Sequence, residues 1–182
     1  MRSLEGNLWR YKWFSALVFT PFALPTLVLF WKDCGLTMFD IFLLQGIFAV
    51  AVVLLEVPTG MVADRLGKRR SLLISTSLWF VSFVLYFFSH SFAAFLALEI
   101  LMALASSLLS GADSSLLYDS LKALGREDDF SRIEGQTRGI QMTSFALSNL
   151  LGGFIGSYSM RAAIGLSLNL MAAYILLSHN LR

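Results

Sequence analysis

Three acidic residues lie inside long apolar stretches of the sequence: Glu56, Glu99 and Asp113. An ionised acid at membrane depth is costly unless it is paired, hydrated or protonated, so it usually faces a bundle interior and marks a solute pathway or a proton site. Arg138 enters a later apolar stretch from the side on which Glu56 and Asp113 are expected. We therefore predict a functional cluster of Glu56, Asp113 and Arg138. A permanent salt bridge that only joins three helices is the alternative.

Other polar residues share helical faces with these acids. At 100° per residue, the polar residues of the second, fourth and fifth apolar stretches each gather on one face, and leucines lie opposite them in the fourth. Such faces suit the lining of a cavity between helices. The candidates for a substrate or proton pathway are Gln45, Glu56, Glu99, Asp113, Arg138, Gln141 and Asn149. For Glu99, near the outer side, a hydrated place in the outer vestibule is the alternative.

Six apolar stretches must position these side chains. Hydrophobic residues make up 57% of the 182 residues and charged residues 14%, whereas a soluble domain is about one quarter charged. Because about 20 apolar residues cross a bilayer as a helix, we expect an all-α integral membrane protein with six transmembrane helices in one domain over residues 1–182. The expected helices are 11–31, 39–63, 71–89, 92–118, 137–158 and 162–178.

Prolines and glycines predict local features of these helices. Pro21 and Pro25 remove backbone donors from the first helix and should kink it. Gly152, Gly153 and Gly156 indicate close packing of the fifth helix on a neighbour rather than contact with a substrate.

Charge predicts the orientation and excludes several functions. Of the 14 lysines and arginines, all but Lys32 and Arg161 fall on one side of the expected spans, which places both termini in the cytoplasm. With a net charge of only +2 and no basic patch interleaved with aromatic residues, nucleic acid is not an expected partner. Cys34 is the only cysteine, zinc-ligand spacing is absent, and neither a phosphate-binding glycine loop nor a nucleophile elbow occurs. We expect no metal, no cofactor and no enzymatic activity.

The connection between the second and third stretches reads GMVADRLGKRR over residues 60–70. Its glycines allow close backbone approach, its acid can act at a helix end, and its basic residues hold the loop in the cytoplasm. By composition alone, an ordinary positively charged cytoplasmic loop explains the segment equally well.

This segment resembles the loop signature of the major facilitator superfamily, G-x-x-x-D-R-x-G-R-R-R, with Lys68 as a conservative departure. The stretches EVPTG at 56–60 and SGADSSLLYDSL at 110–121 resemble a subset of bacterial members. In that family the loop acts in the conformational switch, where the acid and a following arginine lock the cytoplasmic side in one state. The resemblance implies gate residues at Gly60, Asp64, Arg65, Gly67, Arg69 and Arg70, with Asp119 as the acidic partner.

The resemblance also implies a half-transporter. A complete member has two six-helix halves, whereas this sequence resembles the amino-terminal half alone, with a weak 3+3 repeat inside it. The second half would come from an identical chain in a homodimer, or the sequence is a truncated part of a twelve-helix protein. Glu99 stands where many proton-coupled drug exporters of the family have an arginine, so proton-coupled efflux is left open.

We therefore expect a secondary active transporter in the bacterial inner membrane. It would move a small organic, amphipathic solute by alternating access, with membrane lipid and a second half as its partners. The alternative from another class is a membrane module that has lost transport and binds a lipid or a partner protein. Flux of solute in proteoliposomes distinguishes the two.

Overall fold

The computed structural model describes residue 20, residues 22–159 and residues 162–163, 165–167 and 169. Within that range, the side chains of Arg69, residues 111–114 and Leu116 are not described. The described elements are helices. They are α2 Leu24–Asp33, α3 Met38–Leu66, α4 Lys68–Phe88, α5 Phe92–Ala123, the short 3-10 helix η1 Glu127–Asp129, and α6 Phe130–Tyr158.

Local sequence signals set the starts of these helices. The Thr37 hydroxyl accepts a hydrogen bond from the Asp40 backbone N–H at 3.2 Å, and the Asp40 carboxylate accepts one from the Thr37 N–H at 2.9 Å, which forms a capping box before α3. Ser91 caps α5 by accepting from the Ala94 N–H at 3.3 Å. Pro25 stands in the first turn of α2, where its missing N–H is tolerated.

The first predicted helix, 11–31, falls partly outside the described residues. The part that the structure shows begins at Leu24 and continues to Asp33, and Phe22 and Ala23 form a turn before it.

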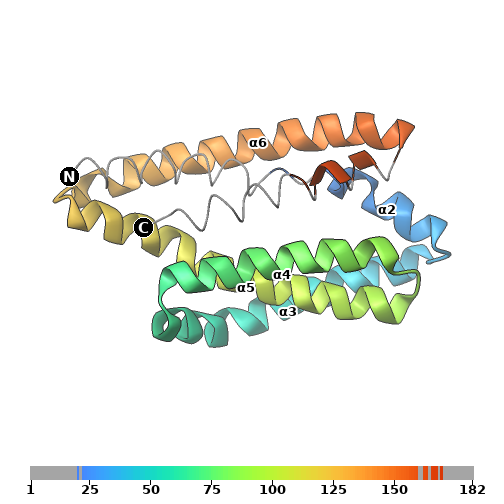
Figure 1. Cartoon of the computed structure of the whole chain (residues 1–182), viewed down its shortest axis with the longest axis horizontal. Helices are drawn as coiled ribbons and strands as arrows, with labels where there is room; N and C mark the ends of the chain where they lie inside the picture. The colour runs from blue at the N-terminus through green and yellow to red at the C-terminus, as the bar shows by residue number, and fades with distance from the viewer. Residues whose placement is uncertain (1–19, 21, 160–161, 164, 168, 170–182) are drawn as a thin grey trace.

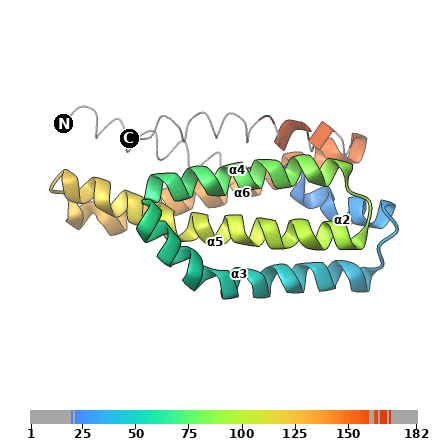
Figure 2. The ribbon, with the colours of Figure 1, turned by 60° about the horizontal axis from the view of Figure 1, so that its bottom comes forward.

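Helix α3 bends at a place that we did not predict. Pro58 lies inside α3 and removes a backbone donor there, and Figure 2 shows α3 bending over its last turns.

Helices α3, α4 and α5 form a three-helix bundle, and Figure 2 shows them side by side. Its first end, the Trp31 end, contains the connections from α2 to α3 and from α4 to α5. Its other end, the Gly67 end, contains the single residue that joins α3 to α4. A buried cluster holds the Trp31 end together, formed by Trp31, Ile41, Leu44, Tyr86, Phe95, Leu98 and Met102.

Helix α6 packs on α2 through glycines (Figure 1). A Cβ atom added to Gly152 would lie 2.1 Å from the Phe22 carbonyl oxygen, and one added to Gly156 would lie 2.0 Å from Thr26 Cγ2. Gly153 has only an ordinary contact, 3.9 Å from Pro25 Cβ. The prediction of close packing is confirmed for Gly152 and Gly156. A third segment also contacts the start of α2, because the Ala23 N–H donates to the Ser167 hydroxyl at 3.0 Å.

Three of the described helices are long and apolar enough to cross a membrane: Met38–Leu66, Arg70–Phe88 and Phe92–Ser110. Large apolar side chains of α3 face outward, including Phe39, Phe42 and Val57, each at least 70% exposed. The hydrocarbon tails of a bilayer can cover such an apolar surface. The all-α membrane architecture is therefore confirmed. The predicted sixth span, 162–178, lies largely outside the described residues.

Candidate functional site

The Gly67 end brings most of the predicted gate residues together. Gly67 has φ +87°, a conformation that glycine adopts without strain, and α4 starts at the next residue. A surface pocket of about 480 Å³ opens at this turn. Its lining residues are Ala63, Asp64, Leu66, Gly67, Lys68, Arg70 and Asp119. The loop between two helices thus lies directly beside the acid near the end of α5.

Lys68 makes the contact that joins this loop to α5. Its Nζ lies 2.5 Å from Asp119 Oδ2 and donates to the Ser115 carbonyl at 3.2 Å. The acid that we predicted as a gate partner is thus engaged, and the cation is the residue that departs from the family signature. A lysine carries a compact charge on a flexible four-carbon stem, so it can reach acceptors one turn apart on a neighbouring helix. Sequence reasoning missed this role because it treated Lys68 only as a substitute for arginine.

The remaining gate candidates lie near the pocket or outside its lining. Arg65 is exposed on the α3 side of the turn, and Arg70, which lines the pocket, is exposed on its α4 side. The backbone of Arg69 belongs to the first turn of α4. Gly60 lies within α3, where an added Cβ would meet nothing within 4 Å. The structure therefore shows no packing reason for glycine at that position.

The structure leaves the predicted cluster of Glu56, Asp113 and Arg138 as a prediction. Glu56 is exposed on α3, and among the described ion pairs none includes it. The side chain of Asp113 is outside the described set. Arg138 approaches Glu134, with Nη2 3.8 Å from Oε1, and donates from Nη1 to Gln141 Oε1 at 3.2 Å.

The pathway candidates Gln45, Gln141 and Asn149 differ in how far their side chains are buried. Gln141 is buried on α6 at 1% exposure. Asn149 is half-buried on the same helix and donates from Nδ2 to the Phe145 carbonyl at 2.8 Å. Gln45 is exposed on α3. Beside the α6 candidates, a second surface pocket of about 460 Å³ is lined by Gln136, Gly139, Ile140, Thr143 and Ser144.

Glu99 does not occupy a hydrated vestibule in this conformation. Its side chain is 2% exposed, and its Oε1 accepts a hydrogen bond from the Tyr86 hydroxyl at 2.7 Å. The alternative that we gave for this residue is wrong here because the Trp31 end is closed by aromatic side chains. Hydropathy placed Glu99 near the outer end of a span, but it could not show that α2 and α4 cover it.

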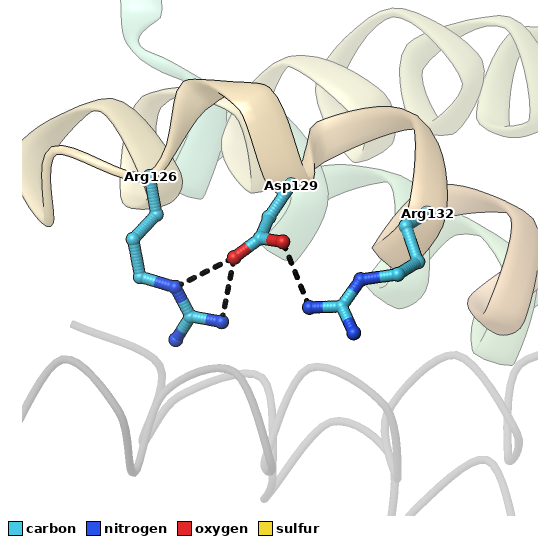
Figure 3. A network of polar contacts seen from close by, with 3 residues as sticks. All are labelled: Arg126, Asp129 and Arg132. Atoms are coloured by element: carbon cyan, nitrogen blue, oxygen red, sulfur yellow. Dashed lines mark hydrogen bonds and ion pairs between the residues drawn. The ribbon is translucent and has the colours of Figure 1, made fainter.

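The turn between α5 and α6 holds a polar network outside the apolar spans (Figure 3). Asp129 Oδ2 accepts from Arg126 Nε at 2.9 Å, and Asp129 Oδ1 accepts from Arg132 Nη2 at 2.7 Å. The hydrogen bond from Arg126, followed by that from Arg132, holds the pKa of Asp129 below its usual range. Within the described part of the chain, no group of three or more His, Cys, Asp or Glu side chains could hold a metal ion.

Comparison with known proteins gives a family and a set of relatives. Three relatives described as "Quinolone resistance protein NorA" come from Staphylococcus aureus strains N315, MW2 and COL. Each is 26% identical over 138 residues, which cover 76% of this chain and 34% of the relative. The chain thus spans about a third of the length of these curated relatives. Residues 13–179 match the model of the Major Facilitator Superfamily. Because that match covers almost the whole sequence, the chain belongs to the Major Facilitator Superfamily.

Proposed function

We propose that this chain forms a six-helix half of a secondary active transporter and moves a small organic, amphipathic solute by alternating access. Membership of the family over residues 13–179 supports the transport class. The name of the staphylococcal relatives refers to quinolone resistance, which is in keeping with export of a drug-like solute. The second half would come from an identical chain or from the rest of a longer protein. The observation that carries the proposal is the contact of Lys68 with Asp119 and Ser115 at the Gly67 end.

This contact has the properties of a gate that opens in each cycle. The side chains of Lys68 and Asp119 are 27% and 55% exposed, and an exposed ion pair contributes only about 0.2–1 kcal/mol. Such a pair fixes the loop against α5 in one conformation and still breaks readily when the helices move. Arg65 and Arg70 remain exposed beside it and would face the second half.

In this proposal the Gly67 end lies in the cytoplasm. The basic residues of the turn favour that side, and both chain termini would follow it. The membrane would be the bacterial inner membrane, and the energy source would be an ion gradient, with the proton as the first candidate. The gate residues then control access from the cytoplasmic side.

Flux in proteoliposomes tests the proposal, with norfloxacin as the probe and an imposed pH gradient as the driving force. We expect Lys68→Ala and Asp119→Asn to lower the flux by up to about fivefold. An interaction of about 1 kcal/mol, the upper end for an exposed pair, changes a population ratio by that factor. Lys68→Arg should keep most of the flux because it retains the charge.

Lys122→Ala is the matched control, because Lys122 is an exposed lysine of the last turn of α5 that no described ion pair includes. Equal losses in the Lys68→Ala and Lys122→Ala variants would contradict the gate. A wild-type protein that is folded in the vesicles but moves no solute would favour the alternative, a membrane module without transport activity.

A further inference from the structure

The proposed function gives no role to the buried carboxyl group of Glu99 on α5, which the sequence offered as a pathway candidate. Its side chain is 2% exposed and accepts one hydrogen bond, from the Tyr86 hydroxyl. None of the ion pairs in the described part of the chain includes Glu99. A buried carboxylate with a single neutral donor is costly, and the group avoids that cost by taking up a proton.

Aromatic side chains surround Tyr86, the hydrogen-bond partner of Glu99. The ring of Tyr86 lies 5.2 Å from that of Phe95, 6.3 Å from that of Trp31 and 6.4 Å from that of Phe30, measured between centroids. These rings come from α2, α4 and α5, so the site exists only while the three helices are packed at the Trp31 end. Separation of these helices would admit water to Glu99.

A second observation points to a change at the same place. The indole Nε1 of Trp31 is buried in a residue that is 1% exposed, and it makes no hydrogen bond of ordinary geometry, although the Tyr86 hydroxyl lies near it. An unpaired buried donor is uncommon and is costly for the folded state. Trp31 therefore places an unsatisfied donor in the same cluster as Tyr86, whose hydroxyl already donates to Glu99. Water that reached this end on opening would satisfy the Trp31 N–H as well as a carboxylate at Glu99.

The other titratable groups around this cluster do not neutralise Glu99. From α4 the cluster contains Tyr86, and Cys34 packs against it after α2. The members that α3 contributes, Ile41, Leu44 and Phe48, are not titratable. At the rim of the cluster, the Asp40 carboxylate accepts a hydrogen bond from the Thr37 hydroxyl, and the His90 ring forms one with the Phe88 carbonyl. Lys32 and Asp33 are exposed.

We propose that Glu99 is a proton-binding site that is loaded when the Trp31 end is closed and emptied when it opens. On opening, the carboxyl O–H bond breaks, the proton passes to the entering water, and the carboxylate remains hydrated. The binding site rests on burial and hydrogen bonding alone. Its use to couple a proton to transport rests on the function proposed above.

Infrared difference spectroscopy of the 182-residue chain in lipid nanodiscs tests the binding site directly. We expect a C=O stretching band of a protonated carboxyl group at neutral pH, which disappears at alkaline pH. Glu99→Gln should remove the band. Tyr86→Phe should shift it to higher frequency, because the carbonyl oxygen loses its hydrogen bond. Asp128→Asn, which changes an exposed acid in the turn before α6, is the control and should leave the band in place.

Either of two results would overturn the binding site: no protonated carboxyl band in the wild type at neutral pH, or a band that persists in Glu99→Gln. If Glu99→Gln does not fold, the shift in Tyr86→Phe decides, since an unshifted band would belong to another acid. These readouts need no transport. A missing band therefore refutes the site, whereas a present band with no solute flux refutes only the proposed transport function.

Labelling of Cys34 by a membrane-impermeant maleimide tests the link to opening. Cys34 is the only cysteine and packs at the edge of the cluster at the Trp31 end. We expect its labelling rate to rise more steeply with pH in the wild type than in Glu99→Gln, because only the wild type can lose the proton. The thiol's own titration contributes equally to both proteins. Identical pH dependences would overturn the link.

Discussion

The carboxylate of Asp129 connects two arginines in the turn before α6, and its pKa is lowered mainly by the hydrogen bond from Arg126. A carboxyl group with a depressed pKa stabilises the fold above its ordinary pKa, and that contribution is lost as the pH falls through the depressed value. Asp129→Asn should therefore lower the thermal unfolding midpoint at neutral pH, and the difference from wild type should vanish at strongly acidic pH.

Thermal unfolding in detergent, followed by circular dichroism at several pH values, measures this effect. Asp128→Asn is the matched control, because Asp128 is exposed in the same turn and none of the described ion pairs includes it. A difference between Asp129→Asn and wild type that is constant with pH would contradict the electrostatic explanation.

The thiol of Cys34 should react slowly for a cysteine near the membrane surface. Burial, and then the neighbouring Asp33 carboxylate, raise the pKa of Cys34, and the thiolate is the reactive form. Asp33→Asn should speed the reaction with maleimide at neutral pH, because it removes the charge that disfavours the thiolate. The rate is measured by mass spectrometry over time. An unchanged rate would mean that burial alone controls the thiol.

Single residues were only partly predictable from sequence. The Gly67 turn and the acid at Asp119 were found through their pattern and spacing, because a signature records residue types at fixed positions along the chain. Lys68 and Tyr86 were not found as partners, because each acts across two helices whose relative placement no local pattern records. The burial of Glu99 was not predicted from the sequence, for the same reason.

At the scale of helices, α2 and α6 approach each other at glycines. A Cβ on Gly152 would overlap the Phe22 carbonyl oxygen, which belongs to the backbone and cannot move aside cheaply. We expect Gly152→Ala to destabilise the protein by about 1–3 kcal/mol, the usual range for overpacking. Gly139→Ala on the same helix meets nothing within 4 Å and should stabilise it by about 0.5–1 kcal/mol, because alanine is the better helix former.

Denaturant titration in mixed micelles compares these two variants with the wild type. Equal effects of Gly152→Ala and Gly139→Ala would show that the close approach of α2 and α6 does not persist in the membrane.

The turn between α3 and α4 depends on one backbone conformation. Gly67 has φ +87° and ψ 141°, a sparsely populated combination that an L residue adopts at a cost of about 1–3 kcal/mol. Gly67→Ala should therefore lower stability by about that amount and weaken the alignment of Lys68 with Asp119. Gly46→Ala, in the same helix α3 and also without an atom within 4 Å of an added Cβ, is the comparison and should be tolerated. Flux and unfolding midpoint measured together would contradict this view if both variants behaved alike.

Hydropathy predicted where long apolar helices lie, but it did not predict where they end. The fourth stretch was expected at 92–118, whereas α5 continues to Ala123, and the fifth was expected from 137, whereas α6 begins at Phe130. A helix continues as long as its backbone hydrogen bonds and caps allow, and polar residues extend it into water. The start of α3 lies close to the expected one. The second stretch was expected from residue 39, and α3 begins at Met38, directly after the capping residue Thr37.

At the scale of the whole molecule, the proposed function requires a second half. We predict that the purified chain in nanodiscs has the native mass of a dimer, since closed twofold pairing is the expected symmetry for identical copies. Native mass spectrometry measures it. A monomer at all protein-to-lipid ratios would contradict the homodimer and favour a second half supplied by a longer protein.

Fold class was predictable at this scale because composition reports the solvent of a protein, and the loop signature reports its family. Substrate and pairing were not predictable, because both depend on surfaces between halves. The outward-facing Phe39, Phe42 and Val57 illustrate the difficulty, because lipid tails and an apolar partner helix place the same demands on such side chains.

The length of α5 has a mechanical consequence. Its 32 residues make a rod of about 48 Å, well beyond the roughly 30 Å of hydrocarbon that a bilayer offers. The rod continues past the ends of α3 and α4 and turns back at η1 (Figure 2). If α5 tilts as one body, a tilt of about 5° at the Trp31 end displaces the far tip by roughly 4 Å over that length. Probes attached near the tip would thus report small rearrangements around Glu99 as large displacements.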